Sequence, residues 1–445
     1  LNLCPLLSQG QIEALEHHAS PDLQNIYLPK LISGAWTGTM NLTEPQAGSD
    51  VGALSSKAEL QADGTYKISG QKIFITWGEH DVAENICHLV LARLPDGKPG
   101  PKGVSLFLVP KFIPNADGSL GARNDLRCVS LEHKLGIHGS PTAVMEFSEA
   151  KGWLVGQEHN GMACMFTMMN NARLAVGMQG VGVAEGAYQH ALAYAMDRKQ
   201  GRSMIAEGTG TIIDHADVRR MLAQMKSEIF AARSIGVACA VAIDMAKATG
   251  DAEWLARAAF LTPIAKSFGS DVGVAMADIG VQIHGGMGFV EETAAAQYLR
   301  DVRITPIYEG TNGIQAMDLV ARKMADGGAA AFALMDDIEA LAAVSSSNFS
   351  NAVQASVAEL RSTTEWLLRQ ELIDRFAGAV AYQKAFARVL GGYFHLIAAM
   401  SGERKRMRMA AFYINSLLPE YTSLCTQARA GSRDLYELEL DDFAA

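Results

Sequence analysis

The stretch that decides the fold is residues 166–201, FTMMNNARLAVGMQGVGVAEGAYQHALAYAMDRKQG. Its apolar residues recur at helical spacing with few interrupting charges, which is typical of a helix buried on several sides. Two further stretches of this kind follow at 215–250 and 255–286, and a shorter one lies at 292–305. We therefore expect residues 151–326 to form a bundle of three long helices and a shorter fourth.

The sequence before this helix has a different texture, with short β-rich runs bounded by Gly, Pro and Asp. Examples are YKISGQKIFIT (66–76) and GVSLFLVP (103–110). Asp63-Gly64 stands between two alternating runs, which is a strong hairpin signal. These patterns predict an antiparallel β domain over residues 37–150, and the helical spacing within residues 1–36 predicts the remnant of an N-terminal helical domain.

The sequence after the bundle predicts a further helical part. Gly and Ser clusters within residues 325–351 indicate a break, and helical spacing then resumes, so we expect a separate helical module over residues 327–445. The order helix, β, bundle, helix is that of an α+β multidomain protein rather than a doubly wound α/β fold. GGMGF (285–289) is therefore not interpreted as a Rossmann phosphate loop.

Composition narrows the possible partners of the 445-residue chain. Its net charge of -10 argues against nucleic acid or an anionic membrane as the main partner. No run approaches 18 uninterrupted apolar residues, so we expect no membrane span. The basic run ERKRMRM (403–409) is interpreted as a solvated helix face in preference to a polyanion site.

The six cysteines are scattered and form no CxxC pair, which favours reduced thiols, a cytoplasmic location and no metal site. The chain begins at Leu1 without a basic segment typical of a signal peptide. We expect the sequence to begin partway into a longer protein.

Four motifs stand in one order at wide spacing: MNLTEPQAGSD (40–50), IFITWGEHD (73–81), QIHGGMGF (282–289) and IYEGTNGIQ (307–315). Together they resemble the flavin-dependent acyl-CoA dehydrogenase family. The resemblance implies an N-terminal helical domain, a middle β domain and a C-terminal four-helix bundle. The module after residue 326 resembles the C-terminal extension of a larger subgroup. The implied ligands and partners are FAD, an acyl-CoA substrate, an electron acceptor such as electron-transfer flavoprotein, and further copies of the chain in a homodimer or dimer of dimers.

The first two motifs carry the residues implied to hold the flavin. Small and hydroxylated residues leave room for backbone N–H groups and for the hydroxyls of Thr43 and Ser49 to meet a flavin edge or a pyrophosphate. By resemblance, Thr43 contacts the flavin and Ser49 contacts its phosphates or the acyl-CoA. Phe74, Ile75 and Thr76 would line the isoalloxazine, with Thr76 near its N5 atom. Plain strand core is the alternative for Phe74 and Ile75.

Further residues are implied at the other end of FAD. Those expected to reach the diphosphate and adenosine of a neighbouring subunit's FAD are Arg198, Gln282, Gly285 and Gly286. An Arg suits this task because its planar guanidinium binds phosphate oxygens in pairs. The sequence departs from the common family pattern here, since Gln200 stands where an aromatic residue usually precedes the Gly. Thr311 and Asn312 are implied to touch the adenosine end.

Glu309 matches the catalytic base of the family. A lone Glu before Gly at a helix junction is usually a solvated turn, and the other three motifs favour the catalytic interpretation. A carboxylate in an apolar cleft has its pKa raised toward neutrality and becomes a better base, and Gly310 permits the tight turn that presents it. The resemblance also implies that the backbone N–H of Glu309 and a flavin ribityl hydroxyl hold the thioester carbonyl. Arg173 matches a family Arg near the substrate, with helix capping or a structural ion pair as alternatives.

The resemblance to the larger subgroup implies oxidation of 3-methylthiopropionyl-CoA to methylthioacryloyl-CoA, in dimethylsulfoniopropionate catabolism. The Met-rich segment 161–171 could line a soft, polarizable pocket, and bundle core is the favoured interpretation. Three alternatives stay open: a dehydrogenase of straight short- or medium-chain fatty acyl-CoA, an acyl-CoA oxidase, and a non-enzymatic flavoprotein that binds nucleic acid.

Overall fold

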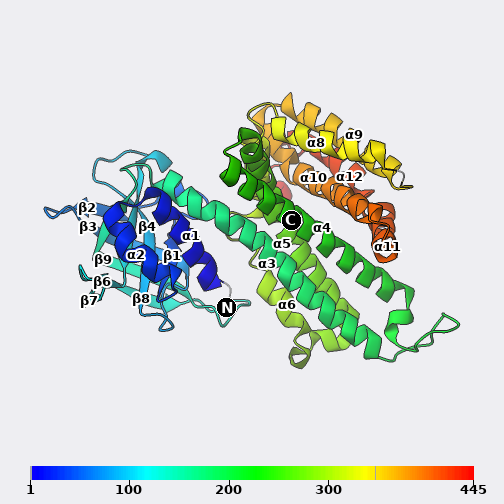
Figure 1. Ribbon diagram of the computed structural model, residues 1–445, viewed down its shortest axis with the longest axis horizontal. Helices are drawn as coiled ribbons and strands as arrows, with labels where there is room; N and C mark the ends of the chain where they lie inside the picture. The colour runs from blue at the N-terminus through cyan, green and yellow to red at the C-terminus, as the bar shows by residue number, and fades with distance from the viewer. Residues whose placement is uncertain (1–2, 346, 445) are drawn as a thin grey trace. The chain divides into compact units, whose positions relative to one another are not determined.

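The computed structural model describes residues 3–345 and 347–444 (Figure 1). Its contacts divide the chain into two compact units, one up to Ala172 and one from Arg173 onward. We call them the β unit and the helical unit.

The β unit opens with two helices, α1 (Leu3–His18) and α2 (Pro21–Ile32). Ser20 caps α2 by accepting a hydrogen bond from the Leu23 N–H, and Pro21 occupies the first helical position, where its missing N–H costs nothing. Both helices pack their apolar faces against the sheet, and their side chains share one core cluster with it. The predicted N-terminal helical remnant is therefore packed onto the β unit.

The strands that follow in the described residues are β1 (Trp36–Asn41), β2 (Lys57–Leu60), β3 (Tyr66–Thr76), β4 (Asn85–Arg93), β5 (Val104–Pro110), β6 (Phe112–Pro114), β7 (Leu120–Arg123), β8 (Leu126–Leu131) and β9 (Thr142–Val155). The main sheet runs β1-β4-β2-β3-β9-β5, with β8 beside β9, and it closes because β5 also pairs with β4. The predicted hairpin is confirmed: β2 and β3 are antiparallel, and the Asp63 carboxylate accepts the Thr65 N–H in the turn between them.

The predicted antiparallel domain also contains two parallel pairings, a short one between Lys57 of β2 and Arg93 of β4 and a longer one between β1 and β4. β1 and β4 pair in parallel over residues 36–41 and 85–90. The chain between them forms the β2–β3 hairpin, which lets β4 return beside β1 in the same direction.

Strand β4 lies between two clusters of buried side chains. Along β4, Leu89 and Leu91 belong to the cluster that contains the helices, whereas Val90 and Ala92 belong to the cluster inside the closed sheet. Because β4 is covered on both faces, every residue in it except Arg93 is buried, and most of them are apolar.

The helical unit is built on α3 (Gly161–Asp197), α4 (Ala216–Thr249) and α5 (Ala252–His284), and the three predicted long helices are confirmed. Shorter helices follow, α6 (Ala295–Val302) and α7 (Asn312–Ala321). α3 and α5 cross at glycines: a Cβ on Gly177 would lie 2.5 Å from the Ala265 carbonyl oxygen, and one on Gly269 would lie 2.4 Å from the Gly177 oxygen. Only glycine permits this approach of the two backbones.

The break predicted over residues 325–351 is mostly helix, since α8 (Ala329–Val344) occupies it. Gly327 and Gly328 both adopt left-handed backbone angles and turn the chain directly into α8, whose Ala-rich sequence favours helix. Residue 346, within the Ser-rich part of the predicted break, lies outside the described residues.

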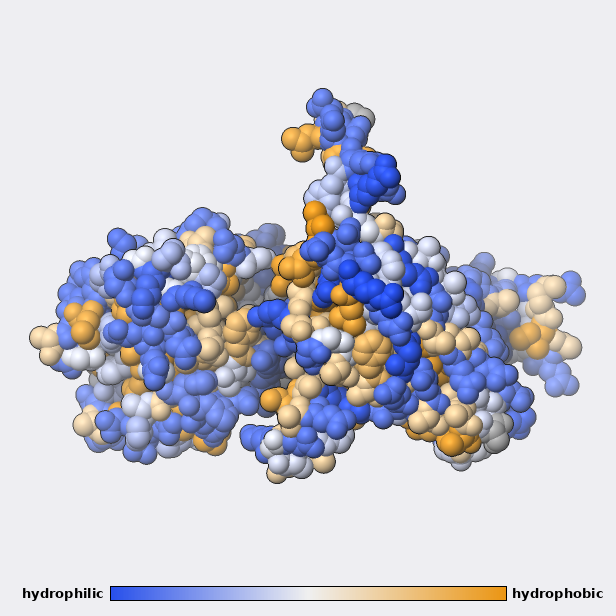
Figure 2. All heavy atoms as spheres, turned by 90° about the horizontal axis from the view of Figure 1, so that it is seen from above, coloured by the Kyte–Doolittle hydropathy of each residue, from blue (hydrophilic) through white to orange (hydrophobic). Residues whose placement is uncertain are grey.

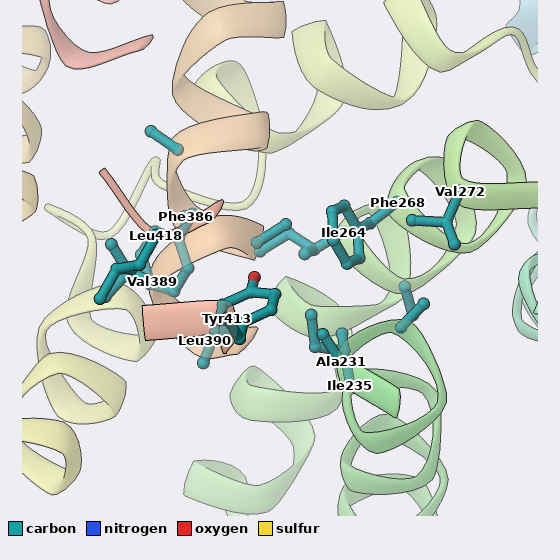
Figure 3. Close-up of a cluster of buried hydrophobic side chains, with 14 of the residues drawn as sticks. Ala231, Ile235, Ile264, Phe268, Val272, Phe386, Val389, Leu390, Tyr413 and Leu418 are labelled. Atoms are coloured by element: carbon teal, nitrogen blue, oxygen red, sulfur yellow. The ribbon is translucent and has the colours of Figure 1, made fainter. Parts of the chain in front are cut away.

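The remaining helices form the C-terminal extension: α9 (Ser350–Leu368), α10 (Leu372–Met400), α11 (Arg404–Phe412), α12 (Glu420–Ala428) and α13 (Arg433–Tyr436). α10 packs against α4, α5 and α7. Figure 3 shows one hydrophobic cluster to which Ile235 of α4, Phe268 of α5 and Leu390 of α10 contribute. The extension is helical, as predicted, and it shares its core with the bundle because α10 is apolar on several sides.

α4 is the one helix in the described part of the chain whose length and composition would allow a membrane crossing. Its buried residues, among them Met225, Ile229 and Cys239, belong to the core that α5 and α10 complete. The surface seen in Figure 2 is mostly polar, with apolar residues in scattered patches.

Candidate active site

Glu309 lies in the turn between α6 and α7, in a backbone conformation that L-residues rarely adopt. Its φ is 56°, and that of Gly310 is 82°. The Gln315 amide donates to the Glu309 carbonyl at 3.1 Å, and a Cβ on Gly310 would come within 2.6 Å of the same amide nitrogen. A glycine is therefore required at position 310, and the strain at Glu309 is of the kind that marks functional sites.

The Glu309 carboxylate is not in bulk solvent. Its Oε2 atom is buried and has no hydrogen-bond partner among the described residues. Burial raises the pKa of Glu309 to about 7, and the charges of Arg173 and Lys266 oppose that rise. A carboxylate with a pKa near neutrality can both hold and release a proton at physiological pH, as a general base must.

Arg173 lies on α3 and is buried, as is Asp318 on α7. Burial lowers the pKa of the Arg173 guanidinium, while the charges of Asp318 and Glu309 raise it. Arg173 therefore lies close enough to both the candidate base Glu309 and the buried acid Asp318 to interact with their charges. This position is compatible with substrate binding and with a structural ion pair.

Thr311 and Asn312 have their side chains engaged within the protein. The Thr311 hydroxyl caps α7 by accepting the Ile314 N–H at 3.2 Å. The Asn312 amide nitrogen donates to Asp271 at 2.7 Å, which anchors the turn to α5. Their contact with the adenosine of FAD stays a prediction.

In the β unit, the first two motifs meet. The Ile73 N–H donates to the Thr43 carbonyl at 2.9 Å. Between Lys72 and Ile75, the pairing of β3 with β9 shifts register, and Phe74 adopts a φ of 60°. The bulge leaves Phe74 58% exposed and turns Ile75, 2% exposed, into the core inside the sheet.

The Ile75 side chain is therefore part of the strand core, whereas the Phe74 side chain is exposed. Thr43 and Thr76 are half-buried, and Ser49 is exposed. These side chains are accessible to a ligand on the surface of the β unit.

The residues predicted to bind the far end of FAD lie together at one end of the helical unit. Arg198 directly follows α3, and Gln282, Gly285 and Gly286 lie at the end of α5. The two helix ends meet, since the rings of Tyr194 and His284 are 4.5 Å apart. All four predicted residues are exposed, and nothing lies within 4 Å of the position of a Cβ on either glycine.

Arg198 is far from the candidate base. It follows Arg173 by 25 residues, which at the helical rise is about 37 Å along α3. The structure therefore keeps the Arg198 group and the Glu309 turn apart within one chain.

Comparison with known proteins agrees with this geometry. Family models described as acyl-CoA dehydrogenase middle domain and C-terminal domain match residues 39–150 and 159–324. A third, acetyl-CoA dehydrogenase C-terminal like, matches residues 331–439. An acyl-CoA dehydrogenase of Bacillus subtilis is 33% identical over 297 residues, which are 65% of this chain and 69% of that protein. The chain belongs to the acyl-CoA dehydrogenase family.

The 3-methylmercaptopropionyl-CoA dehydrogenase of Ruegeria pomeroyi is 54% identical over 332 residues, 73% of this chain. The match spans only 56% of that relative's length. A solved structure of Caenorhabditis elegans ACDH-11, in complex with C11-CoA, covers 98% of this chain and 74% of that one, with a TM-score of 0.79 and 20% identity. That structure shares the fold of the whole chain, extension included.

Sequence reasoning missed two buried lysines beside the acyl-CoA dehydrogenase motifs. Lys72 on β3 pairs with Glu44 of the first motif, with 2.8 Å between Nζ and Oε1. Lys266 on α5 lies beneath the Glu309 turn. Strand alternation could have revealed Lys72, because it stands four residues after the core residue Ile68 and thus on the same face. No comparable local signal marks Lys266.

Proposed function

We propose that the chain catalyses the FAD-dependent α,β-dehydrogenation of an acyl-CoA thioester, with Glu309 as the base. The observation that carries the proposal is the buried Glu309 carboxylate on a strained turn, with its pKa raised to about 7. A water-poor carboxylate of this kind suits the removal of a weakly acidic α-proton.

The residues present fit FAD on two independent grounds. The strained bulge of β3 presents Phe74 beside half-buried Thr43 and Thr76, an aromatic face with hydroxyl groups next to it. Gly285 and Gly286 offer backbone that a phosphate can approach without side chains in the way. Phe74, Thr43, Thr76 and Ser49 would hold the flavin end, and Arg198 and Gln282 the diphosphate. When bound, FAD supplies the two-electron acceptor for the hydride that leaves the β-carbon.

The chain's own residues would handle the proton. The Glu309 carboxylate takes the proton from the α-carbon, and the Glu309 N–H donates to the thioester carbonyl, where negative charge develops. Arg173 and Lys266 favour the ionised carboxylate before proton transfer. Burial of the Glu309 Oε2 atom keeps water from the carboxylate, which strengthens these interactions.

For the substrate we favour 3-methylthiopropionyl-CoA, supported by the name of the Ruegeria relative. A straight short-chain acyl-CoA is the second candidate, supported by a butyryl-CoA dehydrogenase of Syntrophomonas wolfei that is 44% identical over 332 residues. The Met-rich segment does not discriminate, because Met165 and Met168 are buried in the core of the β unit.

The remaining parts of the proposal follow from the family. An electron acceptor such as electron-transfer flavoprotein would reoxidise the enzyme. The distance between the Arg198 group and Glu309 supports a homodimer or dimer of dimers in which Arg198 serves a neighbouring copy. All six cysteines are free thiols, which supports a reducing, cytoplasmic location.

The test is the rate of turnover with a panel of acyl-CoAs, the methylthio compound among them, and an artificial electron acceptor. Glu309→Gln keeps the size of the side chain and removes the base, so activity should fall by at least a hundredfold while the yellow cofactor stays bound. A Glu309→Gln variant as active as the wild type would refute the assignment.

Two further measurements separate the alternatives. Anaerobic reduction by substrate followed by admission of air distinguishes a dehydrogenase, which reoxidises slowly, from an oxidase, which reoxidises rapidly and releases peroxide. A salt-dependent shift of DNA mobility would support a nucleic-acid-binding relative instead.

A further inference from the structure

Lys266 is fully buried on α5, at 0% exposure, and its ammonium group faces the Glu309 turn. Its Nζ donates to the Gly310 carbonyl at 2.8 Å and to the Asn312 side-chain oxygen at 2.9 Å. A buried ammonium is costly unless it is hydrogen-bonded and near opposite charge. One acceptor, Gly310, belongs to the turn that carries the proposed base, and the other, Asn312, begins α7 directly after that turn.

The turn depends on such anchors because Glu309 holds a strained backbone conformation. Such a conformation persists only where its surroundings fix it. Gln315 holds the Glu309 carbonyl from one side, and Lys266 holds the next carbonyl, that of Gly310, from the other. Asn312 is bound in turn to Ser270 and Asp271 of α5.

Charged side chains face this cluster from two helices, α3 and α5. Glu309 is faced by Arg173 of α3 and Lys266 of α5. Burial lowers the pKa of Lys266 to about 8, Glu309 and Asp271 raise it, and Arg173 lowers it. Lys266 therefore carries its charge at pH 7, next to the carboxylate.

We propose that Lys266 is a positioning residue for Glu309. Its ammonium group holds the turn through Gly310 and Asn312, and its charge favours the ionised carboxylate that removes the α-proton. This inference rests on the proposed function, since it assigns Lys266 a role toward that base.

The experiment uses the full chain with bound FAD and two readouts. The first is the pH profile of kcat/KM, whose acidic limb reports protonation of the base. The second is the infrared carboxyl band that disappears in Glu309→Gln, followed as a function of pH without turnover. In Lys266→Met, both midpoints should move to higher pH by on the order of one unit, because an opposite charge is lost. Lys266→Arg should move both midpoints back toward the wild type.

A matched control is Lys384→Met. The Lys384 Nζ atom on α10 lies 3.7 Å from the Oδ2 atom of Asp271, the same acid that binds Asn312. The Lys384 side chain is 50% exposed. This substitution should leave both midpoints unchanged. If Lys266→Met does not fold, Lys266→Gln, which keeps hydrogen-bond donors but no charge, should show the same upward shift.

A folded Lys266 variant without charge whose midpoints match the wild type would overturn the inference, as would an equal shift in Lys384→Met. Failure of the proposed function looks different: the wild-type protein would turn over no acyl-CoA, while the infrared titration would still report whether Lys266 acts on Glu309.

Discussion

The buried ion pair between Glu44 and Lys72 permits a quantitative prediction about the β unit. The two side chains are 2% and 0% exposed, and 2.8 Å separates Nζ from Oε1. Glu44 also accepts the backbone N–H and hydroxyl of both Ser55 and Ser56. The carboxylate thus ties the first flavin motif to the start of β2, and Lys72 ties it to β3.

Ionised Glu44 and ionised Lys72 contribute to the free energy of unfolding with opposite signs. Burial alone would raise the pKa of Glu44, yet the charge and hydrogen bond of Lys72 lower it from 4.5 to about 2. At 1.36 kcal/mol per pH unit, this difference stabilises the fold by roughly 3 kcal/mol above pH 4.5, and the stabilisation is lost as pH falls toward 2. Burial lowers the pKa of Lys72 from 10.5 to about 8. That difference costs a similar roughly 3 kcal/mol at any pH below 8.

Because the two contributions nearly cancel at pH 7, removing both charges should change stability little, whereas removing one leaves the other buried without a partner. We expect Glu44→Gln and Lys72→Met each to cost about 3–5 kcal/mol, and the double variant to cost far less than the sum. Calorimetry of the full chain at pH 7 measures this on the transition of the β unit.

The control is Lys67→Met on the same strand, because Lys67 pairs with Glu149 at 2.6 Å in an exposed position. This variant should leave the transition nearly unchanged. The reasoning is refuted if the two single substitutions at the buried pair behave like this control, or if their effects simply add.

Two further predictions concern acid stability and the extension. His88 is buried, and burial, with the charges of Lys111 and His80, lowers its pKa from 6.5 to about 3. Below pH 6.5 the unfolded chain therefore binds a proton at His88 that the folded chain does not bind, so the free energy of unfolding falls as pH drops. In His88→Gln, this dependence should be weaker by up to about 1.4 kcal/mol per pH unit, as measured by urea titrations between pH 5 and 7. Arg388 of α10 donates to buried Glu228 of α4 at 2.7 Å, so Arg388→Met should destabilise the helical unit by about 3–5 kcal/mol in calorimetry, and an unchanged transition would show that the pair does not hold the extension to the bundle.

The sequence predicted those parts of the fold whose signals are local. The Asp63-Gly64 hairpin and the three long helices follow from turn chemistry and helical spacing within one stretch. The parallel pairing of β1 with β4 joins residues about 50 positions apart, and no local pattern specifies the direction in which distant strands meet. The packing of α10 onto α4 and α5 was missed for the same reason, because an apolar helix face indicates burial without indicating the partner.

In the candidate site, too, the sequence predicted features with a local signal and not those that depend on distant residues. Glu309 was found through motif resemblance, but its raised pKa comes from burial within the fold, and the charges that oppose the rise, Arg173 and Lys266, come from two other helices. Within β3, strand alternation would place Phe74 on the core face with Ile68 and Lys72, and the bulge between Lys72 and Ile75 reverses this, so that Phe74 is exposed and Ile75 is buried.

In each unit, a buried lysine that is costly to desolvate fixes the position of nearby backbone. Among the described residues, Lys72 and Lys266 are the only lysines that are buried, and each donates to a backbone carbonyl beside a proposed site residue. Lys72 donates to the Leu42 carbonyl, next to Thr43, and Lys266 to the Gly310 carbonyl, next to Glu309. Replacing both charges of the Glu44–Lys72 pair would change stability little, but an apolar side chain in place of Lys72 could not hold a carbonyl in place. The double variant at Glu44 and Lys72 should therefore retain most of its stability and yet bind FAD less tightly, because the hydrogen bonds that fix the Thr43 segment are gone while the core remains.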